Sequence, residues 1–225
     1  MPWQWPVGAA FAFALALIAT PAGVSGAALL LPVQLSVLGV PSPAVTPTNL
    51  LFNVAATPGA LLRFRQERRL VGPLTGLLMA GTLPGVIAGA VIRVEFLSGS
   101  RAFLVVAAGV LLPLGLWLTL GSQRVAPGRP APSRRAGWLV WALALLVGTL
   151  GGIYGIGGGS LLAPILLLAG FSAYEVAPAT LAATFVTSIV GVLAYQILQL
   201  SHGGSYLQQA VADPPNARPV HASTA

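Results

Sequence analysis

The stretch GGIYGIGGGSLLAPILLLAG, residues 151–170, places six glycines within positions 151–159, in one of the most apolar parts of the chain. Each glycine lowers the stability of a helix by roughly 1 kcal/mol relative to alanine. The cluster therefore predicts that a helix stops here, although the residues on both sides are apolar enough to form buried helices.

The composition of the whole chain is that of a membrane protein. Of its 225 residues, 56% are hydrophobic and 7% are charged, whereas about a quarter of the residues of a soluble domain are charged. A helix needs about 20 apolar residues to cross a bilayer. Several apolar runs approach or exceed that length, the full set being 7–20, 26–40, 44–62, 71–92, 102–120, 137–150 and 160–200. We predict an all-α, polytopic helical membrane protein.

The net charge of +7 comes from arginine, since the chain has no lysine. These arginines lie between the apolar runs, where they orient a membrane protein, so we expect a lipid bilayer and not nucleic acid as a partner. The chain has no cysteine, and His202 and His221 both lie near its C-terminal end. We therefore expect no disulfide, no metal site and no cofactor. Residues 1–6 carry no basic side chain, so no cleaved signal peptide is predicted.

Two similar segments indicate an internal repeat. GVSGAALLLP (23–32) resembles GIGGGSLLAP (155–164), and Pro47 and Pro178 follow at nearly the same spacing. We expect the first repeat within residues 1–120, with a broken helix at 7–40 and helices at 44–62, 71–92 and 101–120. A basic loop follows at 121–137. The second repeat, within 138–200, is truncated and has a broken helix at 138–170 and a helix at 176–200. The segment 201–225 is polar and rich in proline and alanine, so we expect it to be disordered.

The apolar pieces on either side of each break are about 14 residues long, or roughly 21 Å as a helix. One piece is too short to cross about 30 Å of hydrocarbon, and two are long for a single crossing. Each pair is therefore either a re-entrant hairpin or one long broken span. Irregular backbone at membrane depth requires protein or water to satisfy its polar groups, so the break should face a cavity.

The distribution of arginine predicts the topology. Loops 63–70 and 121–137 are strongly basic, whereas 93–101 is only weakly so, and we place both basic loops in the cytoplasm. In a parallel repeat, the end of the helix 176–200 would also be cytoplasmic and basic. Its sequence, LSHGGSYLQQ, has no arginine. This absence favours inverted repeats.

Polar residues follow each break at the same distance, on one helix face. The first stripe is Asn49, Asn53 and Thr57, and the second is Thr180, Thr184 and Ser188. The hydroxyls could instead satisfy carbonyls of their own helices or join helices together. Two asparagines one turn apart, at a position that the repeat duplicates, favour binding. In contrast, the glycines of 71–92 have small-xxx-small spacings that favour helix packing; they are Gly72, Gly76, Gly81, Gly85 and Gly89.

The breaks add a second potential binding element. A helix that starts after a break presents unpaired N–H groups, which bind anions, and transporters use broken helices in this way. The alternative is that the glycines only permit a tight turn. The candidate binding residues of the breaks are Gly23, Ser25 and Gly26 in the first and Gly155, Gly157, Gly158, Gly159 and Ser160 in the second.

Enzyme motifs are absent from the sequence. GIGGGS lacks both the third glycine of a dinucleotide-binding fingerprint and the GK[ST] of a P-loop. The four acidic residues, Glu67, Glu95, Glu175 and Asp213, fall in loops, at helix ends or in the tail. We expect no catalytic residues.

GIGGGSLLAP, the following TLAATFVTSIVGVLAY (180–195) and the segment TLPGVIAGAVI (82–92) resemble the sulfite exporter TauE/SafE family, also called toluene-sulfonate uptake permeases. The resemblance covers about 7–200. It implies a multi-pass transporter of the bacterial inner membrane, acting on sulfite, sulfonates or related sulfur and carboxyl anions. The chain departs from the family in two ways: its first break is poor in glycine, and its second half is short. The short second half implies either that another copy in a homo-oligomer supplies the remaining helices or that the protein is an impaired member of the family.

These observations predict a carrier in which a small oxyanion binds between the two breaks. Backbone N–H groups near 23–28 and 155–160 and the side chains of the two stripes would hold it. Rocking of one repeat against the other would alternate access. A passive pore lined by the stripes and a truncated, non-transporting member are the alternatives.

Overall fold

The computed structural model describes residues 42–97 and 134–201, together with positions 10, 13, 14, 105, 108, 109, 113 and 116. The regular elements of the two continuous ranges are helices: α3 (Ser42–Ala56), α4 (Pro58–Gln66), α5 (Pro73–Glu95), α7 (Arg134–Tyr154), α8 (Leu162–Leu168) and α9 (Ala173–Ser201). Most of the broken helix expected at 7–40, including Gly23, Ser25 and Gly26, lies outside the described residues, as do most of the helix 101–120, residues 121–133 of the basic loop and residues 202–225 of the tail. The loop prediction is wrong for residues 134–137, which form the start of α7.

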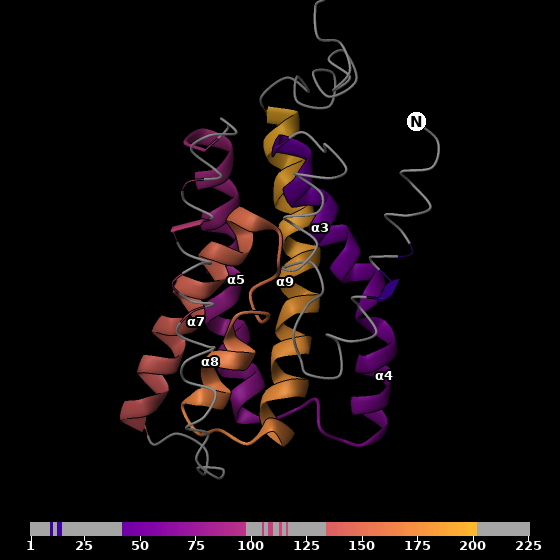
Figure 1. Cartoon of the computed structure of the whole chain (residues 1–225), viewed down its shortest axis with the longest axis vertical. Helices are drawn as coiled ribbons and strands as arrows, with labels where there is room; N and C mark the ends of the chain where they lie inside the picture. The colour runs from indigo at the N-terminus through magenta and orange to yellow at the C-terminus, as the bar shows by residue number, and fades with distance from the viewer. Residues whose placement is uncertain are drawn as a thin grey trace, which may run out of the picture.

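Three of these helices are long and apolar enough to cross a membrane, namely α5, residues 137–154 of α7 and residues 173–198 of α9. They run along the long axis of the molecule, with α3 and α4 beside α9 (Figure 1). The prediction of an all-α membrane protein is confirmed. The division into two inverted repeats stays a prediction, because the first break lies outside the described residues.

Helices α5 and α7 pack backbone against backbone. Their contact is the most extensive between any two described helices. A methyl group at Gly81 would lie 2.7 Å from the carbonyl oxygen of Trp141, and one at Gly148 would lie 2.7 Å from that of Thr82. Such close approach requires small residues on both helices.

The packing role predicted for the α5 glycines holds for three of them. Gly81, Gly85 and Gly89 all lie against the α7 backbone, as the small-xxx-small spacing predicted. Among the described residues, nothing lies within 4 Å of a methyl group added at Gly72 or Gly76, so packing at these two positions stays a prediction. These two positions precede the segment of α5 that α7 approaches.

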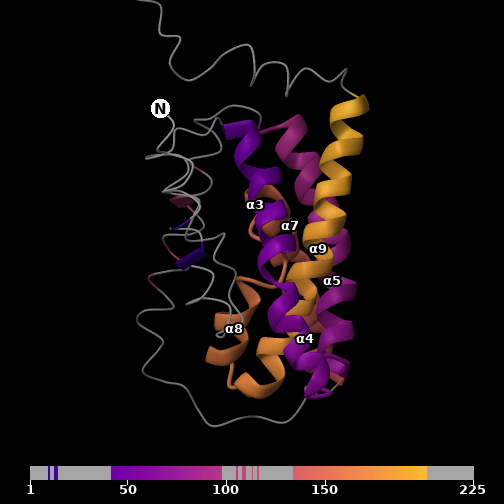
Figure 2. The same cartoon turned by 90° about the vertical axis from the view of Figure 1, so that its right-hand side faces the viewer.

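The helix expected over 44–62 is divided in two. Thr57 separates α3 from α4, and Pro58 begins α4. Proline has no N–H to donate to the carbonyl one turn earlier in a helix, and its ring clashes with the preceding turn. The bonds on either side remain, from Thr57 N–H to Asn53 O and from Leu61 N–H to Thr57 O, both 3.1 Å. The chain bends at Thr57, and α4 follows α3 down the molecule (Figure 2).

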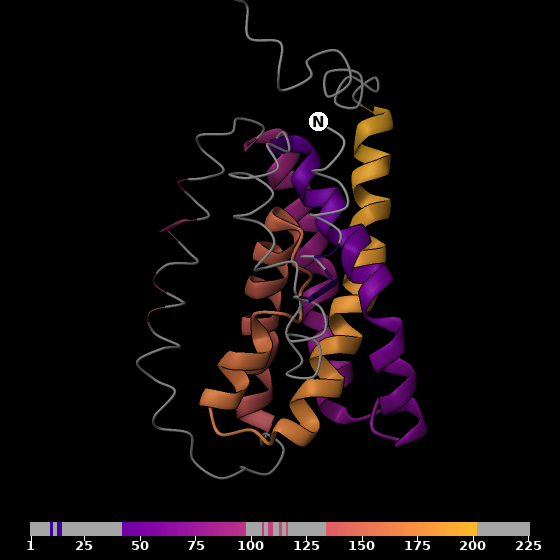
Figure 3. The same cartoon turned by 45° about the vertical axis from the view of Figure 1, so that its right-hand side comes forward.

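The glycine-rich stretch forms a hairpin. α7 ends at Tyr154, and the chain then turns back so that α8 runs toward the end of the molecule at which α9 begins (Figure 3). Gly155 and Gly157 have φ angles of +74° and +75°, which only glycine adopts without strain. The returning chain lies against Gly151, whose added methyl group would be 2.7 Å from the Gly157 carbonyl oxygen. Of the two arrangements left open by length, residues 134–168 form a hairpin and not one continuous broken span.

Candidate functional site

Residues 155–160, here called the glycine loop, lie halfway along the membrane-crossing helices. Every residue of the loop is buried. A methyl group at Gly158 would lie 2.6 Å from Cβ of Thr82, and Thr82 is near the middle of the 23-residue α5. The Gly158 N–H donates to Thr187 Oγ1 at 3.0 Å, near the middle of the 29-residue α9. The break is therefore surrounded by protein at half the height of these helices.

The two predicted polar stripes converge on the glycine loop. From α3, the Asn53 side-chain amide donates to the Gly155 carbonyl at 3.3 Å, and Asn49 Cβ lies beside Gly155. From α9, Ser188 Oγ would be 3.2 Å from a methyl group at Gly157. Thr184, one turn earlier, lies between Gly157 and Gly159.

Ten of the fourteen candidate residues therefore belong to the loop or contact it: Asn49, Asn53, Gly155, Gly157, Gly158, Gly159, Ser160, Thr180, Thr184 and Ser188. Thr57 lies one turn below Asn53, at the bend between α3 and α4. Its hydroxyl donates to the Asn53 carbonyl of its own helix. Gly23, Ser25 and Gly26 are outside the described residues.

Several hydroxyls of the site bond to their own helix or turn, as the alternative interpretation of the stripes expected. Thr180 Oγ1 donates to Val176 O at 2.8 Å, and Thr187 Oγ1 donates to Ala183 O at 2.6 Å. Ser160 Oγ donates to Ile156 O and lies 3.5 Å from Thr184 Oγ1. Their protons are used within the fold, while their oxygens remain able to accept.

Asn49 and Ser188 differ from these residues. Both are fully buried. Within the described part of the chain, neither the nitrogen nor the oxygen of the Asn49 amide has a hydrogen-bond partner, and neither does Ser188 Oγ. A buried polar group without a partner costs about 1–3 kcal/mol, and such groups are rare in folded proteins. The site therefore holds unused donors and acceptors on both of its walls.

The expectation of bare N–H groups at the break is wrong for two residues of the loop. The Gly155 N–H donates to Gly151 O at 2.9 Å, and the Gly158 N–H donates to Thr187 Oγ1. The tight turn supplies the first acceptor and α9 supplies the second. α8 has only seven residues. In this conformation, the N–H groups of Gly155 and Gly158 are therefore not available to an anion.

Two residues that were not predicted from the sequence donate hydrogen bonds to the last carbonyl groups of α7. The last carbonyls of a helix have no partner within it. Thr46 Oγ1 donates to Ile153 O at 3.0 Å, and the Tyr195 hydroxyl donates to Gly152 O at 2.8 Å. A helix that stops inside a membrane protein needs such donors, and this need is the signal that could have identified Thr46 on α3 and Tyr195 on α9.

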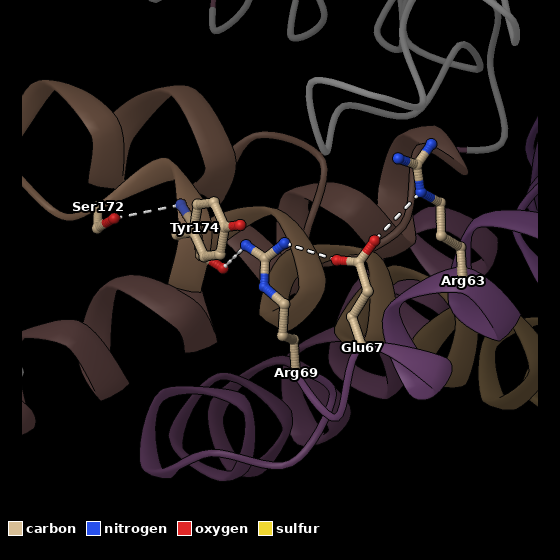
Figure 4. Close-up of polar contacts among 5 residues, drawn as sticks. All are labelled: Arg63, Glu67, Arg69, Ser172 and Tyr174. Carbon is tan, nitrogen blue, oxygen red and sulfur yellow. Dashed lines mark hydrogen bonds and ion pairs between the residues drawn. The ribbon is translucent and has the colours of Figure 1, made fainter.

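A second polar cluster lies at the arginine-rich end (Figure 4). Glu67 accepts from Arg63 Nε at 3.2 Å and from Arg69 Nη1 at 2.8 Å. The Arg69 guanidinium also donates to the Tyr174 carbonyl and stacks 3.4 Å from the centre of the Tyr174 ring. Hydrogen bonds from Arg69 and then Arg63 hold the pKa of Glu67 below its usual value of 4.5. These contacts, here called the latch, join the loop after α4 to the start of α9.

In residues 42–97 and 134–201, no three histidine, cysteine or acidic side chains come together to hold a metal. No curated protein and no solved structure matches the chain significantly. The family model described as sulfite exporter TauE/SafE matches residues 8–212, which include all six helices and the glycine loop. The chain therefore belongs to the sulfite exporter TauE/SafE family of membrane transporters.

Proposed function

We propose that the protein is a permease for small oxyanions, namely sulfite, organosulfonates or related carboxyl anions, in the bacterial inner membrane. The observation that carries the proposal is a pair of buried side chains beside the glycine loop, Asn49 of α3 and Ser188 of α9, which have no hydrogen-bond partner among the described residues. The Asn49 amide and the Ser188 hydroxyl can donate to anion oxygens without adding a charge of their own. A neutral site of this kind avoids a permanent charge at the centre of a bilayer.

The packing around the glycine loop supports a carrier over a passive pore. Added methyl groups at Gly157 and Gly158 would each lie 2.6 Å from a threonine of the surrounding helices, and one at Gly159 would lie 2.7 Å from Thr184 Oγ1. A loop packed this closely admits an anion only if the hairpin and its neighbours move apart. The proposed mechanism is alternating access, in which the hairpin of α7 and α8 moves against α3 and α9.

The test is a panel of fluxes in proteoliposomes that contain the purified protein, with sulfite, sulfoacetate, acetate, chloride and a neutral sugar. We expect saturable uptake of sulfite or sulfoacetate and accelerated exchange when the same anion is present on both sides. Flux that rises linearly with concentration without counter-flow would instead identify a pore. Equal flux of the sugar, or no flux of any anion, would contradict the proposed function.

We propose that the arginine-rich end is cytoplasmic and that the latch holds it closed. Arg69→Ala removes the stacking on Tyr174, which stabilises the closed conformation by about 1 kcal/mol. The population of molecules in which the arginine-rich end is open should therefore rise about fivefold. The chain has no cysteine, so Ser188→Cys provides a single reporter thiol. We expect a membrane-impermeant maleimide, added to inside-out vesicles, to label this thiol about fivefold faster when Arg69→Ala is also present.

Arg65→Ala is the matched control for the latch, because Arg65 is an exposed arginine of α4 outside it. Equal labelling in both variants would rule out a role of the latch in closure. The lowered pKa of Glu67 means that its stabilising pairing is present above the unfolded pKa and lost as the pH falls through the folded pKa. Maleimide reacts with the thiolate, whose fraction falls with pH in both variants alike, so the quantity to compare is the ratio of the labelling rates with and without Arg69→Ala. This ratio should stay constant between roughly pH 5.5 and 8 and should fall only in more acidic buffer, where protonation of Glu67 weakens the intact latch.

A further inference from the structure

The turn that ends α4 places an arginine in a backbone conformation that favours glycine. Glu67 caps the helix, and Arg68, the next residue, has a φ angle of +53°. The Arg68 N–H donates to Arg65 O at 3.0 Å. The Arg69 N–H donates to Phe64 O at 2.9 Å. In this pair of bonds, the Schellman motif, the residue after the cap is usually glycine, because a Cβ atom is disfavoured in the left-handed region.

Arg68 is the single non-glycine residue with a positive φ angle in the part of the chain that the structure describes. A glycine at this position would complete the same turn without strain. Strained residues persist where the side chain has a use, and an observed outlier of this kind is a starting point for a hypothesis of function. The side chain of Arg68 is exposed, so its use concerns something outside the fold.

The turn lies at the boundary of the membrane. The candidate membrane spans of α5 and α9 begin at Pro73 and Ala173. The end of α4 lies at the same end of the molecule as both of these starts (Figure 1; Figure 2). Arg69, which follows Arg68, stacks on Tyr174 at the start of α9. Arg68 is therefore at the level at which the helices leave the hydrocarbon and meet the lipid headgroups.

Two exposed arginines of this turn have exposed apolar residues on either side. Neither Arg65 nor Arg68 takes part in the latch. Leu62, three residues before Arg65 and on the same face of α4, is 58% exposed, and Val71, three residues after Arg68, is 96% exposed. No residue of α4 is buried. Basic and apolar side chains exposed together are typical of a segment that lies in the headgroup region of a bilayer.

We propose that Leu62, Arg65, Arg68 and Val71, here called the headgroup surface, bind an anionic phospholipid. The positive charge of the two arginines complements the lipid phosphate, to which a guanidinium donates two parallel N–H bonds. The two apolar side chains contact the upper part of the acyl chains. Arginine occupies position 68 in place of glycine because it binds the phosphate, although it strains the turn. This proposal is independent of the proposed function, since it uses no residue of the glycine loop.

Basic loops of membrane proteins also orient the chain in the bilayer, and arginines with only that role remain solvated. The two roles differ in the expected effect of Arg68→Gly. If Arg68 only orients the chain, this variant leaves the lipid composition next to α4 unchanged. If Arg68 binds a headgroup, the variant folds at least as well as the wild type and loses the lipid.

The test measures which lipid lies next to α4. The chain has no cysteine, so Gln66→Cys, at an exposed position of α4, carries a single fluorescent reporter. The full-length protein is reconstituted in mixed vesicles of phosphatidylcholine and phosphatidylglycerol, with one of the two lipids brominated so that it quenches the reporter. Quenching as a function of composition gives the ratio of the two binding constants. Ser201→Cys, at the exposed opposite end of α9, carries the control reporter.

We expect the α4 reporter to show about a tenfold or greater preference for phosphatidylglycerol, because each arginine near an anionic headgroup strengthens binding about fivefold. Arg68→Gly should lower the preference about fivefold and leave the melting temperature equal or higher. Arg68→Lys keeps the charge and should lower the preference only about twofold. Raising NaCl from about 50 mM to about 500 mM should also lower it, because salt screens exposed charges. Arg68→Gly should leave the signal of the control reporter unchanged.

Equal quenching by the two lipids at the α4 reporter overturns the proposal. An unchanged preference in folded Arg68→Gly does so as well, and if that variant does not fold, a preference that is insensitive to salt has the same consequence. A preference that inorganic phosphate removes, while chloride at equal ionic strength does not, identifies a soluble phosphate ligand and overturns the assignment to lipid. None of these measurements involves transport, so each outcome leaves the test of the proposed function as it stands.

Discussion

Replacing Gly159 with alanine is expected to abolish transport and to destabilise the fold by roughly 3 kcal/mol, at the upper end of the cost of overpacking. The added methyl group would collide with the main-chain carbonyl oxygen of Thr180 and lie 2.7 Å from Thr184 Oγ1. A main-chain atom within α9 cannot move independently of the helix as a side chain can. α9 must therefore move away from the loop, which separates the two walls of the site. Thermal melting and sulfite flux in proteoliposomes measure the two effects.

Gly76→Ala is the matched control for this prediction. Gly76 is also a glycine of a membrane-crossing helix, but nothing lies within 4 Å of an added methyl group there. Alanine favours helix by roughly 1 kcal/mol over glycine, so this variant should melt at the same temperature as the wild type or higher, with normal flux. Gly159→Ala protein with wild-type flux and melting temperature would show that α9 does not hold the loop as closely as described.

Replacing Asn49 with leucine is expected to reduce sulfite transport about tenfold or more without lowering stability. The variant loses a donor that would bind a charged oxygen, an interaction of about 1.5–3 kcal/mol. The fold loses no hydrogen bond among the described residues, because both polar atoms of the Asn49 amide lack partners there. Removing a buried, unsatisfied amide should leave the melting temperature equal or higher. Initial rates over a range of sulfite concentrations and melting curves without anion are the measurements.

Thr149→Val is the control for Asn49→Leu. It removes a hydroxyl from α7, but that hydroxyl donates to Leu145 O of its own helix at 3.0 Å and lies outside the candidate site. Its flux should equal that of the wild type. Asn49→Leu protein that melts several degrees lower, with wild-type flux in the folded fraction, would assign Asn49 a structural role in place of a binding role.

The candidate site could be predicted from the sequence because its components are local patterns. The i, i+4 spacing of Asn49 and Asn53, and of Thr184 and Ser188, places each pair on one helix face whatever surrounds the helix. The dense glycines marked the break for an equally local reason, the cost of glycine in a helix. The resemblance of these segments to the TauE/SafE family is confirmed by the match over 8–212.

Partners across the fold could not be predicted in this way. Whether the Gly158 N–H is free depends on Thr187, which approaches it only when α9 packs against the loop. The partners of the α7 carbonyls, on Thr46 and Tyr195, lie 107 and 43 residues away along the chain. The spacing of the α5 glycines was the same at Gly72 and Gly76 as farther along, yet α7 reaches only the later ones.

The sequence by itself determined that this protein is helical, lies in a membrane and breaks a helix at 151–159, because hydrophobicity, helix propensity and side-chain periodicity act over a few residues. Only the tertiary structure decided that the chain turns back after α7 as a hairpin, and that α3 and α9 contact the glycine loop. These features depend on which helix faces meet. That choice follows from the packing of segments far apart in the chain, and no short stretch of sequence contains it.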